Sequence, residues 1–130
     1  MISLNLADIA QIVGGRLVAT VSGDTAVAGS VQTDSRLVLE GSIFFALPGE
    51  VTDGALFAGA AVENGAALII AERELELAIP LIVVTDGVAA LAALAAAVVA
   101  RVRALGSLSV VAITGSNGKT TTKNFLARIL

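Results

Sequence analysis

A short loop near the end of the chain combines the residue types that bind phosphate. Gly115 to Thr120 read Gly-Ser-Asn-Gly-Lys-Thr, between an apolar run that ends at Thr114 and a segment with helical periodicity. Glycines in such a turn tolerate positive φ and leave room for a phosphate group. The N-terminus of the following helix adds free N–H donors and a partial positive charge. The loop therefore predicts a nucleotide-phosphate site.

Each residue of this loop has an expected role. We expect Lys119 to reach the β and γ phosphates and to be the catalytic residue, and the Thr120 hydroxyl to bind Mg²⁺. The residues expected to bind ATP are Gly115, Ser116, Asn117, Gly118, Lys119, Thr120 and Thr121. The motif is a shortened one, because Ile113 stands where the standard pattern has its first glycine. The alternative is a plain strand-to-helix turn with a solvated lysine.

Apolar patterns along the rest of the chain predict a mixed α/β fold. Offsets of three and four predict helices over residues 6–13, 56–64 and 88–105, and from 119 onward. Apolar runs bounded by turn residues predict strands over 16–22, 42–47, 67–71, 81–85 and 109–114. Asn5 and Gly14 are expected to begin and end the first helix. At least two strand–helix units therefore lie in the second half of the chain.

The two later helices are each expected to bury one apolar stripe. In the long helix the stripe consists of Val88, Leu91, Ala95, Val98, Val102 and Leu105, and in the last helix of Thr122, Phe125, Leu126, Ile129 and Leu130. The stretch 79–100 could be mistaken for a membrane span, but Asp86 and Gly87 interrupt it. The apolar part that follows has only about fourteen residues, short of the roughly 20 that a span needs. We therefore predict a buried strand and a core helix, with no membrane span.

Composition excludes several kinds of function. The 130 residues suffice for one domain and part of another, and 56% of them are hydrophobic, which argues against disorder. A net charge of −3 without a basic cluster excludes a nucleic-acid surface. The absence of Cys and His excludes disulfides, thiol nucleophiles and imidazole bases. The N-terminus has no basic region and carries Asp8, so we expect no signal peptide and a cytoplasmic location.

The phosphate loop needs partners that the sequence does not supply. Phosphoryl transfer also requires acidic residues that hold the metal and a group that orients the nucleophile. A lone buried strand would in addition expose its edges. Because the chain ends at Leu130, we expect it to be part of a longer protein and to turn over no ATP by itself.

Five stretches, in order along the chain, resemble the Mur ligase family. They are TDSR (33–36), EGSIFFALPGE (40–50), DGALF (53–57), NGAALII (64–70) and TGSNGKTTTK (114–123). The resemblance implies a small mixed α/β domain at residues 1–85 that binds the UDP end of a cell-wall precursor. It implies that residues 86–130 hold a connecting helix and the first strand, phosphate loop and helix of a parallel-sheet ATPase domain. Ala55 stands where the family usually has His, so no role is carried over to it.

The opening MISLNLADIAQIVGGRL and the lysine at 123 resemble the family member that adds D-Ala-D-Ala to UDP-MurNAc-tripeptide. This resemblance implies a monomeric bacterial enzyme in which ATP phosphorylates a carboxylate and the amine of D-Ala-D-Ala attacks the acyl phosphate. The alternative within the family adds the third stem residue to UDP-MurNAc-dipeptide. From other classes, a non-catalytic UDP-sugar-binding module and an unrelated regulatory ATPase also remain.

The resemblance assigns the UDP end of the substrate to Asp34, Ser35 and Arg36. The planar guanidinium of Arg36 suits the oxygens of a pyrophosphate, and the hydroxyl of Ser35 can donate or accept a hydrogen bond. The alternative for this trio is a polar turn in which Asp34 caps local N–H groups. The dipeptides at 48–49 and 53–54 are expected to be ordinary turns.

Overall fold

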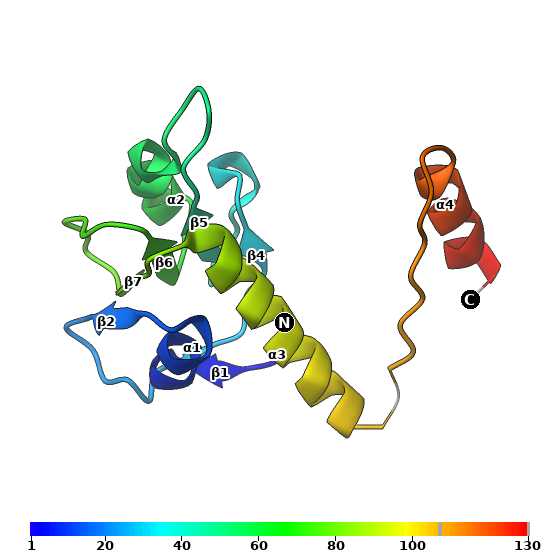
Figure 1. Ribbon diagram of the computed structural model, residues 1–130. Helices are drawn as coiled ribbons and strands as arrows, with labels where there is room; N and C mark the ends of the chain where they lie inside the picture. Colours follow the sequence, from blue (N-terminus) through cyan, green and yellow to red (C-terminus); the bar gives the residue numbers. More distant parts are fainter. Residues whose placement is uncertain (107, 130) are drawn as a thin grey trace.

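The computed structural model describes residues 1–106 and 108–129, and a five-stranded sheet forms its centre (Figure 1). The strand order is β2-β7-β6-β5-β4, in which β2 is antiparallel to β7 and the other pairs are parallel. The strands are β2 (Arg16–Val18), β4 (Val31–Gln32), β5 (Ile43–Ala46), β6 (Leu68–Ala71) and β7 (Leu81–Val83). A short antiparallel pair, β1 (Leu4–Asn5) and β3 (Ala26–Val27), lies beside it. The expected mixed α/β class is confirmed.

The helices begin and end close to the predicted residues. They are α1 (Leu6–Val13), α2 (Ala58–Glu63), α3 (Gly87–Ala104) and α4 (Lys119–Ile129), with 3-10 turns η1 (Ser35–Leu37) and η2 (Gly54–Phe57). The Asn5 side chain accepts a hydrogen bond from the Asp8 N–H, and Gly14 ends α1 with φ of 65°. The capping prediction is therefore confirmed, because a side-chain acceptor starts the helix and a left-handed glycine stops it.

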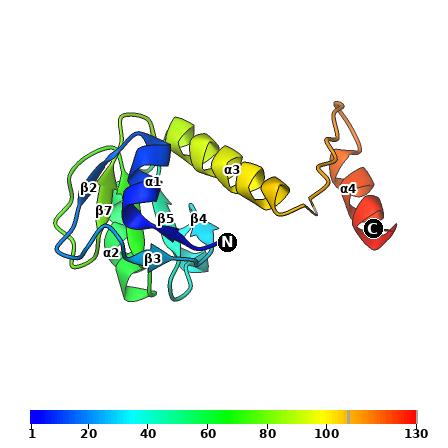
Figure 2. The same cartoon turned by 90° about the horizontal axis from the view of Figure 1, so that it is seen from below.

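Helices cover both faces of the sheet (Figure 2). Ile43 and Phe45 of β5 belong to the core shared with α1 and α3, whereas Phe44 and Ala46 belong to the core shared with α2. Successive side chains of a strand point to opposite faces, so this strand needs apolar residues at every position. The double cover explains why the strand sequences are continuous apolar runs rather than alternating ones.

The predicted stripe of α3 is confirmed in part. Its members Leu91 and Val98 pack against the core, whereas Val88, Ala95 and Leu105 are exposed. Ala90 and Leu94 are buried instead, in the core that α3 shares with α1. Apolar residues lie on almost every side of this helix, so their spacing does not identify the buried face. Contact with α1 selects it.

Helix α3 is also the helix, within the described residues, that is long and apolar enough to cross a membrane by length and composition. Its mean hydropathy over 18 residues is 1.7. Of this window 17% is buried, and Ala90 and Leu94 are among its buried residues, in the core shared with α1. The absence of a membrane span stays a prediction.

The strand predicted at 109–114 does not form. Residues 108–118, which directly precede α4, contain no strand, and Val110 and Val111 are exposed. A strand needs the N–H and C=O groups of a neighbour, and no described segment pairs with this one. The stripe of α4 is exposed at Phe125 and Ile129, and its last predicted member, Leu130, lies outside the described residues. In both views α4 stands apart from the sheet (Figures 1 and 2).

Candidate functional site

A cleft of about 500 Å³ opens beside η1 and contains the three residues predicted to bind the UDP end of the substrate. Its lining consists of Thr33, Asp34, Ser35, Arg36, Phe44 and Phe57. Its volume falls within the range of small-molecule sites, roughly 300–1,000 Å³. The lining combines polar groups with aromatic residues, which suits a ligand with both charged and planar parts.

The topology places this cleft at the carboxyl ends of parallel strands, where ligands are often bound. Residues 33–36 follow directly after β4, and η2 follows the loop that leaves β5. The two strands are parallel neighbours, so both of these segments extend from their carboxyl ends. Open parallel sheets bind their ligands at this edge, because loops from adjacent strands converge there.

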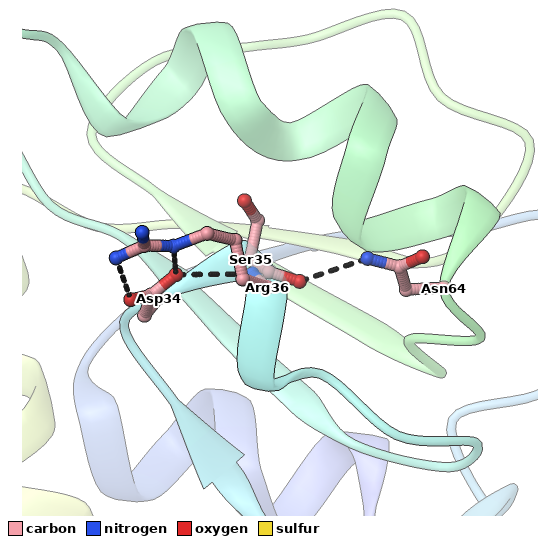
Figure 3. Close-up of polar contacts among 4 residues, drawn as sticks. All are labelled: Asp34, Ser35, Arg36 and Asn64. Carbon is pink, nitrogen blue, oxygen red and sulfur yellow. Dashed lines mark hydrogen bonds and ion pairs between the residues drawn. The ribbon is translucent and has the colours of Figure 1, made fainter.

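Asp34 organises the η1 turn (Figure 3). Its Oδ1 accepts hydrogen bonds from the Arg36 backbone N–H at 3.0 Å and from Arg36 Nε at 2.9 Å, and its Oδ2 accepts one from Nη2 at 2.6 Å. The hydrogen bond from the guanidinium lowers the pKa of Asp34 to about 2, and the carboxylate raises the pKa of Arg36. The capping predicted as the alternative for this trio is present. The roles of the trio toward a ligand stay a prediction.

Arg36 keeps donors for a ligand despite its bond to Asp34. Its side chain is 86% exposed, while that of Asp34 is 34% exposed. A guanidinium has five N–H groups in a rigid fork, and Asp34 engages only those of Nε and Nη2. The remaining N–H groups of Arg36 face solvent. They can donate two hydrogen bonds to phosphate oxygens, which is what a bidentate contact requires.

Sequence reasoning assigned no ligand role to four residues of this site, Thr33, Phe44, Phe57 and Asn64. The Asn64 side-chain amide donates to the Ser35 carbonyl at 2.9 Å, which ties the end of α2 to η1 (Figure 3). Phe44 and Phe57 form the apolar part of the cleft. Asn64 lies in the NGA stretch, which carried the family resemblance but suggested no role. Phe57 was predicted as part of a short helix and lies in the DGALF stretch of the family resemblance, but neither suggested a ligand role.

A second hollow, of about 180 Å³, lies beyond β5 and β6 and includes Ala55. Asp53 accepts a hydrogen bond from the Ala55 N–H at 3.0 Å and pairs with Arg73 at 3.0 Å. Glu72 accepts one from the Gly87 N–H at 2.7 Å, at the start of α3. These charged groups bind one another and the backbone, which agrees with the predicted ordinary turn at 53–54.

Two glycines of the predicted phosphate loop adopt positive φ, as expected for the turn. Gly115 and Gly118 have φ of 143° and 78°, values that residues other than glycine rarely adopt. Helix α4 begins at Lys119, as predicted. A hollow of about 310 Å³ beside the first turn brings Lys119, Thr120 and Lys123 together. Two lysines at a helix N-terminus suit a polyphosphate. The loop stands apart from η1, so the structure does not bring the two predicted sites together (Figure 1).

The metal prediction rests on Thr120 alone. Within residues 1–106 and 108–129, no group of three or more acidic, His or Cys side chains could hold a metal ion. Mg²⁺ commonly takes one or two protein oxygens together with oxygens of substrate phosphates. A hydroxyl in the first turn of α4 fits that pattern only when a nucleotide supplies the other ligands.

Comparison with known proteins gives a family match over more than half of the chain. The profile described as "Mur ligase family, catalytic domain" matches residues 28–112. A UDP-N-acetylmuramoyl-tripeptide–D-alanyl-D-alanine ligase of Mycobacterium tuberculosis is 41% identical, and the alignment covers 100% of this chain and 30% of that protein. A UDP-N-acetylmuramoyl-L-alanyl-D-glutamate–2,6-diaminopimelate ligase of Halalkalibacterium halodurans is 39% identical over 78% of this chain and 20% of that protein.

Solved structures of MurF ligases are also similar to this chain. MurF from Acinetobacter baumannii superposes with a TM-score of 0.80 and 33% identity, covering 99% of this chain and 27% of that chain. MurF ligase from Thermotoga maritima, in complex with ADP, superposes with a TM-score of 0.56 and 38% identity, covering 74% of this chain and 22% of that chain. The chain thus spans about 30% of the length of the curated D-alanyl-D-alanine ligases that it matches.

Proposed function

The chain belongs to the Mur ligase family, and on this premise we propose that it carries the part of an ATP-dependent ligase that binds the UDP end of its substrate. The ligase adds D-Ala-D-Ala to UDP-MurNAc-tripeptide in peptidoglycan precursor synthesis. One observation carries the choice of substrate: the relatives with this activity align with 100% of the chain at 41% identity.

The diaminopimelate-adding ligases are the second candidate. They match at similar identity, 39–43%, but over 77–82% of the chain. The third-residue-adding activity predicted as the alternative is of this kind. Both candidates act on a UDP-linked precursor, so they share the role that we propose for the η1 cleft.

The chemistry of such a ligase makes a poor electrophile reactive. ATP phosphorylates the terminal carboxylate of the precursor, the amine of D-Ala-D-Ala attacks the acyl phosphate, and loss of phosphate leaves an amide. We propose that Arg36 pairs with the pyrophosphate and that Ser35 hydrogen-bonds the nucleotide, while Asp34 orients Arg36. Contacts made far from the reacting carboxylate then hold the precursor in place, which lowers the entropic part of the barrier.

The phosphate loop supplies the ATP contacts of this proposal. The backbone of residues 115–121 cradles the phosphates, Lys119 binds the β and γ phosphates, and the Thr120 hydroxyl is the protein ligand of Mg²⁺. The proposal keeps residues 1–85 as the precursor-binding domain and 86–130 as the connecting helix and the start of the ATP-binding domain. It describes a cytoplasmic bacterial monomer without a membrane span.

Calorimetric titration of the chain with UDP-MurNAc-tripeptide, and separately with UDP, tests the proposal. Wild type is expected to bind both, and Arg36→Ala to bind both about tenfold more weakly, since one charge-assisted contact is worth roughly 1.5–3 kcal/mol. Arg16→Ala is the control, because Arg16 is also exposed and pairs with an acid, Glu74, away from the cleft. A folded chain that binds neither ligand, or binds them equally with and without Arg36, contradicts the proposed role.

A further inference from the structure

We propose that the ring of Phe57 is the surface on which the nucleobase of the bound UDP moiety stacks, which makes Phe57 a substrate-binding residue of the cleft. The inference rests on the proposed function and concerns the same site. It assigns a part of the ligand to Phe57, a lining residue for which the proposed function names no contact.

Aromatic side chains are scarce in this chain, so their positions are informative. The sequence has four Phe and neither Tyr nor Trp. Phe44 and Phe45 are buried in the two cores, at 1% and 0% exposure, and Phe125 lies on α4. Phe57 is 44% exposed and lines the cleft. Among the three Phe residues that precede α4, Phe57 is therefore the one whose ring a ligand can reach.

The backbone keeps this ring at the surface. Phe57 is the last residue of η2 and the one before α2, with φ of −98° and ψ of 0°. The next residue, Ala58, is 2% exposed and packs on the sheet with Phe44 and Ala46. The following side chain occupies the core position, whereas Phe57 stays exposed and lines the cleft. Phe44, which is 1% exposed, is also among the lining residues of the cleft.

The lining of the cleft suits both parts of a nucleoside diphosphate. It includes Arg36, whose N–H groups suit the diphosphate, and Phe57, whose ring suits a planar base. A planar base gains from an aromatic face whatever its hydrogen-bonding pattern, because every base has a π-face. A diphosphate bound to Arg36 leaves the base to contact Phe57 in the same cleft.

The test compares UDP with inorganic pyrophosphate, a probe that lacks a base. Phe57→Leu keeps apolar bulk without a ring, Phe57→Tyr keeps the ring, and Leu56→Ala removes the neighbouring side chain, which is 71% exposed and does not line the cleft. We expect Phe57→Leu to weaken UDP binding about tenfold and Phe57→Tyr to remain within about twofold of wild type. Pyrophosphate binding, and the UDP affinity of Leu56→Ala, should stay unchanged.

Proton NMR adds a readout that a purely structural role would not change. The H5 and H6 signals of uracil should move upfield when UDP binds wild type, because they then lie over a ring, and this shift should disappear in Phe57→Leu. Wild-type binding that Phe57→Leu leaves intact overturns the inference and spares the proposed function. A folded wild type that binds no UDP contradicts both. A parallel loss of pyrophosphate binding in Phe57→Leu also overturns the inference.

Discussion

The guanidinium of Arg36 lies in a fork on the carboxylate of Asp34, with Nε 2.9 Å from Oδ1 and Nη2 2.6 Å from Oδ2. The cation proposed to bind the pyrophosphate is thus oriented by a side chain two positions earlier in the same turn. Because the other edge of the guanidinium faces solvent, the ion pair with Asp34 leaves Arg36 able to bind a ligand. It fixes the direction in which the remaining N–H groups point.

Arg36→Lys tests the importance of this fork. Lysine keeps the charge but presents a single ammonium group, which cannot bind Asp34 and a phosphate in the same plane. We expect UDP affinity between that of wild type and that of Arg36→Ala, measured by calorimetry. Equal affinity of the lysine variant and wild type would show that charge alone is sufficient.

The titration of Asp34 is a second test. Its pKa lies near 2, below the ordinary value of 3.8, because the Arg36 guanidinium favours the carboxylate. The ion pair should therefore be complete above pH 3.8 and be lost as the pH falls through about 2. Carboxyl ¹³C NMR should show this low midpoint in wild type and a midpoint near the ordinary value in Arg36→Ala. A midpoint unchanged by Arg36→Ala would refute the pairing in solution.

The bond from Asn64 to the Ser35 carbonyl predicts a difference between two substitutions. Asn64→Asp is nearly isosteric but cannot donate, and it places a negative charge beside a carbonyl oxygen. We expect it to weaken UDP binding severalfold and to speed amide exchange in η1 more than Asn64→Ala does, since the alanine only removes a bond worth about 0.5–1.5 kcal/mol. Identical exchange rates in η1 for wild type and both variants would show that Asn64 does not hold this turn.

Two glycines should respond to alanine in opposite ways. A Cβ on Gly54 would overlap the Leu47 carbonyl oxygen and lie 2.7 Å from the Leu47 nitrogen, whereas a Cβ on Gly59 in α2 would meet nothing within 4 Å. Gly54→Ala is expected to lower the free energy of unfolding by about 1–3 kcal/mol, the usual cost of overpacking. Gly59→Ala should raise it by up to about 1 kcal/mol. Urea unfolding measures both, and a neutral Gly54→Ala would contradict the close approach.

The packing of α3 on α1 is tested in the same way. Leu94 is 2% exposed, and Leu94→Ala is expected to cost about 2–5 kcal/mol because it leaves a cavity in the core. Val99 lies on the same helix but is 38% exposed, so Val99→Ala serves as the matched control and should cost less than about 1 kcal/mol. Equal effects of the two would mean that α3 does not pack as the structure shows.

Local chemistry made several features readable from the sequence by itself. Asn5 and Gly14 determine the ends of α1, and Gly115, Gly118 and Lys119 determine the turn and the start of α4. Caps and tight turns depend on residues a few positions apart, and their side chains act on the adjacent backbone. The family resemblance came from such short stretches as well. The Asp34 cap, predicted as one alternative, is equally local.

Only the tertiary structure decided which faces and side chains meet. Contact with α1 chose the buried face of α3, and the absence of a described neighbour left residues 109–114 without a strand. The cleft joins Arg36 to Phe57, and Asn64 reaches Ser35 across 29 positions of sequence. These relations depend on the order of strands in the sheet and on competition among apolar surfaces for burial. Spacing along one segment carries no information about either.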